Sequence, residues 1–295
     1  MSTLRLAAAQ YPIDEIKSFT QYEAKLTRWV EGAAREGAQL LVFPEYGAME
    51  LTALAGPAIA GDLHESIAAL QSVLPEADAL HAKLARQHGL FILSASAPVR
   101  GADGRYINTA RFFAPSGQSA AQEKLIMTRF EREEWNVAGG QGQRVFDTPF
   151  GKIGVAICYD VEFPLLVRSL TTAGAEIVLA PSCTDTAFGY WRVRVGAQAR
   201  ALENQCFTVQ SPTVGDAPWS PAVDTNVGAA AVYTPPDIGL PENGVLAIGA
   251  MNAPAWVYAD LDLARIRAVR SGGQQLNNLH WEEQKLIPAS VTPFA

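Results

Sequence analysis

The segment that decides the fold is Lys152-Ile153-Gly154-Val155-Ala156-Ile157-Cys158-Tyr159-Asp160. Its short apolar run predicts a buried strand that meets a polar turn at Cys158, with a helix after the turn. A thiol there could serve as a nucleophile, because backbone N–H groups at the start of a helix are free to face an oxyanion. The strand alone favours a simpler interpretation, in which Cys158 is a small side chain packed in the core.

The composition is that of an ordinary globular protein. The chain has 295 residues, of which 48% are hydrophobic and 18% charged, and it contains no linker, low-complexity segment or repeat. We therefore predict one domain over residues 1–272, followed by a polar tail over residues 273–295. Trp281 and Phe294 could anchor this tail to a neighbouring subunit.

Charge and cysteine usage exclude several classes of protein. The net charge is −7 and no cluster of Lys and Arg stands out, so we expect no nucleic-acid partner. The first ten residues do not resemble a signal peptide, and no apolar run approaches the roughly 18 residues of a membrane span. Three widely spaced cysteines argue against a disulfide framework or a zinc cluster. We expect a cytoplasmic protein without membrane partner, metal or cofactor.

Strand and helix patterns alternate along the chain, with hairpins among them. Helices are predicted at 19–33, 67–87, 164–173, 191–205 and 261–269. Strands are predicted at 4–12, 39–43, 90–97, 105–114, 119–125, 144–147, 152–158, 176–180, 206–210, 228–233, 245–250 and 256–260. Two sheets packed face to face, with helices outside them, satisfy both patterns and give an α/β fold class.

Histidine, the usual base for a thiol nucleophile, is poorly placed in this chain. The histidines fall in or beside helical segments or in the tail, at positions 64, 81, 88 and 280. None follows an apolar strand. A Cys–His hydrolase of another fold is therefore disfavoured.

Two other polar residues share the strand-end position of Cys158. Glu45 follows the apolar run 39–43, and partial burial there would raise its pKa toward general acid–base use. Lys124 ends a short strand, and its ammonium could stabilise an oxyanion. Alone, Glu45 would be a solvated turn residue and Lys124 an ordinary edge-strand lysine. Three complementary groups at strand ends favour a shared catalytic site over a binding or scaffold protein.

These residues lie in segments that resemble the motifs of the nitrilase superfamily of carbon–nitrogen hydrolases. Phe43-Pro44-Glu45 resembles the family's glutamate motif, and Glu123-Lys124-Leu125 resembles its lysine motif. Ile157-Cys158-Tyr159-Asp160, with Phe163-Pro164, resembles its cysteine motif. Residues 191–204 are similar to the family's helix after the site, so the resemblance covers nearly the whole chain. It implies a four-layer α-β-β-α sandwich that forms a homodimer or a higher homo-oligomer.

The resemblance also implies a role for each site residue. Glu45 would be the general base, Cys158 the nucleophile and Lys124 the oxyanion stabiliser, and the backbone N–H of Tyr159 would complete the oxyanion hole. The family often adds a second glutamate after the lysine. Glu131 is favoured here over the nearby acids at positions 133 and 134, because Thr128-Arg129-Phe130-Glu131 leads directly from the motif.

The expected reaction is hydrolysis of a small amide through a Cys thioester, which gives a carboxylic acid and ammonia. Tyr159 stands where nitrile-cleaving members usually have Trp, and Glu162 stands where many amide-cleaving members have Arg. Nitrile or N-carbamoyl hydrolysis and acyl transfer to an amine remain open. Loops after strands are expected to line the substrate pocket. The candidates, which equally suit core packing, are Trp135, Ser182, Cys183, Thr184, Tyr190 and Trp191.

Overall fold

The computed structural model describes residues 3–284 and 288–293, so the predicted anchor Phe294 lies outside the described residues. The strands form two half-sheets that face each other. The first contains β1 (Thr3–Pro12), β2 (Leu40–Val42), β3 (Phe91–Leu93), β4 (Ala97–Arg100), β5 (Tyr106–Phe113), β6 (Ser119–Glu123), β7 (Val137–Ala138) and β15 (Ala255–Asp262). The second contains β8 (Val145–Thr148), β9 (Gly151–Val155), β10 (Ile177–Ser182), β11 (Phe207–Asp216), β12 (Thr225–Asn226), β13 (Ala231–Tyr233) and β14 (Val245–Ile248).

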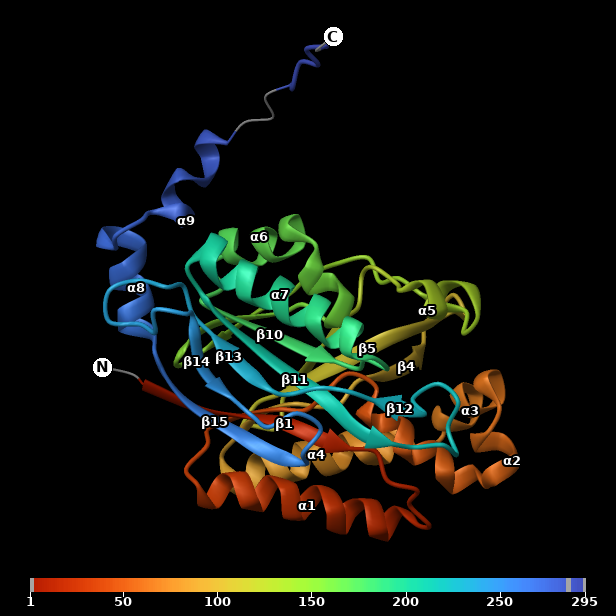
Figure 1. The fold of residues 1–295 in the computed structure, drawn as a ribbon. Helices are drawn as coiled ribbons and strands as arrows, with labels where there is room; N and C mark the ends of the chain where they lie inside the picture. The colour runs from red at the N-terminus through yellow and green to blue at the C-terminus, as the bar shows by residue number, and fades with distance from the viewer. Residues whose placement is uncertain (1–2, 285–287, 294–295) are drawn as a thin grey trace.

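Helices cover the outer faces of both half-sheets (Figure 1). The longer ones are α1 (Phe19–Arg35), α3 (Leu63–Leu70), α4 (Leu74–His88), α6 (Pro164–Thr172), α7 (Ala187–Asn204) and α8 (Leu263–Gly272). The short ones are η1 (Gly47–Ala55), α2 (Pro57–Ala60), α5 (Arg129–Glu133), η2 (Cys158–Glu162), α9 (Asn277–His280) and η3 (Trp281–Glu283). Helices α1 and α4 lie on one side of the sheets, and α6 and α7 lie on the other (Figure 1).

Strand β1 shows why the half-sheets stack. Its side chains alternate between two cores, as a period of two residues requires. Leu6 and Ala8 join the core between the half-sheets, whereas Ala7 and Ala9 join the core under α1 and α4. Because both faces are buried, the middle of the strand, Leu6-Ala7-Ala8-Ala9, is apolar at successive positions. The predicted four-layer α-β-β-α sandwich is therefore confirmed.

Strand β1 also joins the two half-sheets. It pairs in parallel with β2 in the first half, and its last two residues pair in parallel with β11 of the second. The predicted hairpins are confirmed as antiparallel pairs, β5 with β6 and β8 with β9. These connections bring the ends of β2, β6 and β9 toward one region of the molecule, where the site described below lies.

Several predicted boundaries were wrong, among them the start of α7 at Ala187 and the end of β11 at Asp216. The strand predicted at 90–97 is two strands, and the hydroxyls of Ser94 and Ser96 between them accept hydrogen bonds from the backbone N–H groups of Arg111 and Tyr46. The helix predicted at 67–87 is α3 and α4, which meet just before Pro75. The strand predicted at 152–158 ends at Val155, three residues before the cysteine.

After α8, helix α9 extends away from the body of the protein (Figure 1). The described contacts of the tail include a hydrogen bond from Arg168 to the carbonyl of Asn278 at 3.3 Å, and the Arg168 guanidinium lies over the Trp281 ring. Contact of this tail with a neighbouring subunit stays a prediction. Within residues 3–284 and 288–293, no helix combines the length and the apolar character needed to cross a membrane.

Candidate active site

Cys158 is held in a turn that begins after strand β9. Its φ of 49° places it in the left-handed region, which costs a non-glycine residue about 1–2 kcal/mol. The residue begins η2, is 4% exposed, and its Sγ lies 3.9 Å from the carbonyl oxygen of Cys183. The turn takes the thiol out of the strand ladder, so that it lines a cavity at the edge of the core between the half-sheets.

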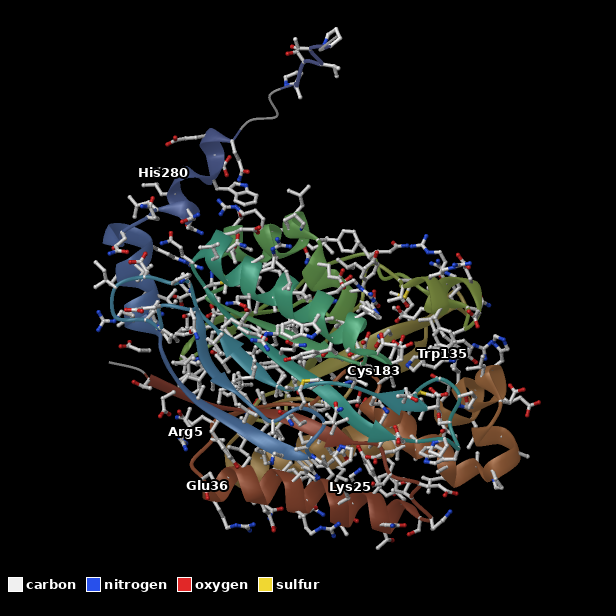
Figure 2. All side chains as sticks on the ribbon, viewed as in Figure 1. Arg5, Lys25, Glu36, Trp135, Cys183 and His280 are labelled. Atoms are coloured by element: carbon white, nitrogen blue, oxygen red, sulfur yellow. The ribbon has the colours of Figure 1, made fainter. Side chains whose placement is uncertain are left out.

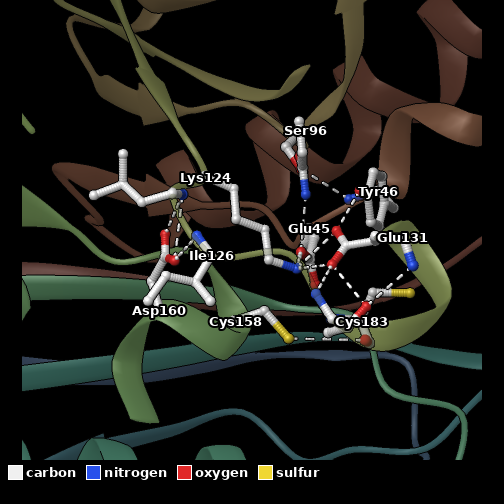
Figure 3. Close-up of polar contacts among 12 residues, drawn as sticks. Glu45, Tyr46, Ser96, Lys124, Ile126, Glu131, Cys158, Asp160 and Cys183 are labelled. Carbon is white, nitrogen blue, oxygen red and sulfur yellow. Dashed lines mark hydrogen bonds and ion pairs between the residues drawn. The ribbon is translucent and has the colours of Figure 1, made fainter. Parts of the chain in front are cut away.

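Asp160 ties this turn to the segment that follows Lys124. Its carboxylate accepts hydrogen bonds from the backbone N–H groups of Leu125 at 3.0 Å and Ile126 at 2.8 Å. Burial raises the pKa of Asp160 to about 6, although these two N–H groups oppose the shift. Asp160 therefore positions the nucleophile turn and the lysine segment relative to each other (Figure 3).

Glu45 lies three residues beyond β2, and its buried carboxylate has three donors. Oε1 accepts hydrogen bonds from Lys124 Nζ at 2.8 Å and Asn108 Nδ2 at 2.9 Å. Oε2 accepts one from the backbone N–H of Cys183 at 2.9 Å. Burial raises the pKa of Glu45 to about 7, although the positive charge of Lys124 opposes the shift. A carboxyl group with this pKa can both accept and donate a proton near neutral pH.

Lys124 follows β6 and lies between two carboxylates. Its Nζ is 2.8 Å from Glu45 Oε1 and 2.7 Å from Glu131 Oε2, and the side chain is 1% exposed. Burial opposes its charge, but the two carboxylates outweigh burial and raise the pKa of Lys124 well above its ordinary value. The ammonium is therefore fixed in place and charged (Figure 3).

Glu131 is the acid that the structure places against Lys124. Thr128 caps α5 and binds the Glu131 carboxylate through its backbone N–H and its hydroxyl, at 2.8 and 2.7 Å. Tyr46 donates a further hydrogen bond to Glu131 at 2.5 Å. Burial alone would raise the pKa of Glu131, but the Lys124 charge and these hydrogen bonds lower it. The competing candidates Glu133 and Glu134 are exposed on the same short helix or at its end.

These groups line one cavity of about 390 Å³. Three of the residues predicted to line the substrate pocket lie on its wall, namely Trp135, Cys183 and Thr184. Tyr159 lies on the wall as well. Trp135 and Cys183 lie toward the same end of the molecule (Figure 2). Such a volume suits a small molecule.

The other predicted wall residues lie elsewhere. Ser182 is fully buried in β10, and Tyr190 is buried with its hydroxyl accepting a hydrogen bond from Arg194. Trp191 is 52% exposed and borders a neighbouring surface groove. The orientation of α7 about its axis explains why Trp191 does not line the cavity. Gly189, Arg192 and Val193 lie on the side of the helix that faces the cavity.

Sequence reasoning missed two residues that hold the buried acids. Asn108 lies inside β5 and donates a hydrogen bond to the Glu45 carboxylate. Tyr46 follows Glu45 in the chain with a left-handed φ of 55°, and its hydroxyl donates a hydrogen bond to Glu131. Asn108 gave one usable signal in the sequence, an Asn inside a predicted strand, where this residue type is uncommon. In the described part of the chain, no three His, Cys, Asp or Glu side chains are arranged to hold a metal ion.

Comparison with known proteins agrees with this architecture. The chain is 32% identical over 273 residues to the probable hydrolase YhcX of Bacillus subtilis (strain 168), a match that covers 92% of this chain and 52% of that protein, so the chain spans about half of its length. It is 25% identical to the omega-amidase NIT2-B of Xenopus laevis, over 97% of this chain and 99% of that one.

A solved structure and a family model point the same way. The carbon–nitrogen hydrolase from Helicobacter pylori G27 has the same fold, with a TM-score of 0.74, 20% identity, and coverage of 91% of this chain and 92% of that one. The model of the carbon–nitrogen hydrolase family matches residues 5–271. With a buried acid, an ammonium and a thiol on one cavity, the chain belongs to the carbon–nitrogen hydrolase family and is an enzyme of that class.

Proposed function

We propose that this enzyme hydrolyses a small amide to a carboxylic acid and ammonia, through a thioester on Cys158. One observation carries the proposal: the Glu45 carboxylate, bound by Lys124, opens onto the same cavity as the Cys158 thiol. The Xenopus laevis relative is an omega-amidase, which supports an amide as substrate.

The first step needs a base, because the resting thiol is neutral. Burial, and after it the Glu45 charge, raise the pKa of Cys158 well above its ordinary value. Glu45 takes the thiol proton as Sγ attacks the amide carbon, and the carbonyl oxygen becomes a tetrahedral oxyanion. The Lys124 ammonium and the backbone N–H of Tyr159 stabilise that charge, since the second residue of η2 has no helical partner for its N–H.

The remaining steps return the enzyme to its starting state. Protonated Glu45 donates its proton to the leaving nitrogen, the C–N bond breaks, and ammonia departs from the thioester. Glu45 then takes a proton from water as the water oxygen attacks the thioester carbon. The C–S bond breaks, the carboxylic acid forms, and the thiol regains its proton from Glu45.

The direct test is ammonia release from a panel of primary amides, N-carbamoyl compounds and nitriles. We expect ammonia and the matching acid from at least one primary amide, with kcat/KM above that for the corresponding nitrile. An acyl product formed with added amine in place of the acid would instead show transfer. Consumption of the nitriles or carbamoyl compounds alone would contradict the proposed amide substrate.

Replacing Lys124 with methionine is expected to lower kcat about 10²–10³-fold, because the oxyanion loses its charged donor. Methionine keeps much of the side-chain length, and circular dichroism with thermal unfolding would establish that the variant is folded. Lys83→Met is the matched control, since Lys83 pairs with exposed Glu23 away from the cavity. A folded Lys124→Met enzyme with kcat within about threefold of the parent would contradict the role given to Lys124.

A further inference from the structure

Beyond the buried cluster, the cavity wall carries charged side chains from four parts of the fold. They come from α5, from η2, from α7 with the loop before it, and from the segment before β12. They are Arg129, Glu162, Asp185, Arg192 and Asp224. The leaving group of a primary amide is only ammonia, so the rest of the cavity holds the acyl part of the substrate. The charged side chains of the wall therefore face any polar or charged group on that acyl part.

Every cation that lines this wall already has an acidic partner. Arg129 Nε lies 2.7 Å from Glu133 Oε2, outside the wall, and Arg192 Nε lies 3.7 Å from Glu162 Oε1. Lys124 is bound by two carboxylates. Among residues 3–284 and 288–293, the wall therefore presents no unpaired cation to a carboxylate on the substrate.

The acidic side chains of the wall are less fully paired with cations than its cations are with acids. Glu162 is four residues after the nucleophile, on the same short helix, and its 22% exposed side chain is met by an arginine that is 61% exposed. Asp185 and Asp224 make no ion pair with any described residue. The wall thus has three acids against two arginines, and one of these, the 86% exposed Arg129, pairs with Glu133 outside the wall.

We propose that the substrate is an amide whose acyl part carries a positively charged group, an ammonium or a guanidinium, bound by Glu162 with Asp185 and Asp224. The proposal rests on the amidase function proposed above and adds its substrate class. A cleft lined with one sign of charge concentrates ligands of the opposite sign and disfavours those of the same sign. The same charges reject an acyl part that ends in a carboxylate.

Three amides of matched length test this. They are γ-aminobutyramide, γ-hydroxybutyramide and succinamate, which end in an ammonium, a hydroxyl and a carboxylate. We expect kcat/KM to fall in that order, with on the order of tenfold between the first two. The preference should shrink as NaCl is raised from about 0.01 M to about 1 M, because the exposed acids are then screened.

Variants locate the source of the preference. Glu162→Gln should lower the ratio of kcat/KM for the cationic amide to that for succinamate by roughly tenfold, and Glu162→Arg should lower it further. The ratio within one variant cancels any loss of folded enzyme. Glu242→Gln removes the same charge from an exposed position outside the cavity, and its ratio should match that of the parent.

The outcomes separate the two proposals. Hydrolysis of succinamate as fast as γ-aminobutyramide by the parent enzyme would overturn the cationic substrate and leave the amidase function standing. An unchanged ratio in Glu162→Gln would likewise overturn the role of Glu162. Ammonia release from none of these amides, nor from the wider panel, would overturn both.

Discussion

Cys158→Ala is expected to lower kcat by about 10⁴-fold or more, because the thioester route is lost and only binding and the oxyanion donors remain. Cys158 is the thiol that shares its cavity with Glu45 and Lys124. In the parent, rapid acid quench followed by mass spectrometry should find the substrate's acyl mass on the peptide that contains Cys158. That adduct should be absent from Cys158→Ala.

Cys206→Ala is the matched control. Cys206 is fully buried, lies outside the cavity, and has its pKa raised by burial to about 12. This variant should keep both the acyl adduct and a kcat within about threefold of the parent, since it removes a thiol of no catalytic role. An acyl group found on another residue, or a Cys158→Ala enzyme with near-parental kcat, would rule out the thioester proposed here.

Glu45→Gln is expected to lower kcat about 10²–10⁴-fold, the usual range for a lost general acid–base. Glutamine keeps the size of the side chain but cannot take the thiol proton. Its amide has one oxygen in place of two, so its NH2 group must face either the backbone N–H of Cys183 or the donors Lys124 and Asn108. Both acylation and hydrolysis of the thioester should slow, because Glu45 serves each of them.

The same residue predicts a pH dependence. Since burial raises the pKa of Glu45 to about 7, the carboxyl group is protonated and inactive as a base below that pH. In the parent enzyme, kcat/KM for an uncharged amide should therefore rise about tenfold per pH unit up to neutral pH and then level off. Glu45→Gln should lack this rise.

Exposed Glu134, which follows α5, provides the control for both measurements. Glu134→Gln should keep the parental kcat and the parental pH profile. A rise near pH 7 that persists in Glu45→Gln would assign that ionisation to another group, of which Asp160, with a pKa raised by burial to about 6, is the nearest in value. That result would contradict the assignment of Glu45 as the base.

The sequence by itself determined the elements and the chemistry available to the fold. The apolar run before Cys158 predicted the buried strand found as β9, and the strand pattern with hairpins predicted the pairs of β5 with β6 and β8 with β9. Glu45, Lys124 and Cys158 were identifiable because each lies at the end of a predicted strand. These signals are local, since periodicity and turn residues act over a few positions of the chain.

Only the tertiary structure decided how these residues meet. Lys124 contacts both Glu45 and Glu131 because β2, β6 and α5 end at one cavity, and Asn108 reaches Glu45 from within β5. The left-handed turn at Cys158 and the side of α7 that faces the cavity likewise depend on packing between distant segments. Such contacts join residues tens of positions apart, so no local pattern encodes them, and the buried charges gain their pKa values only where the folded chain excludes water.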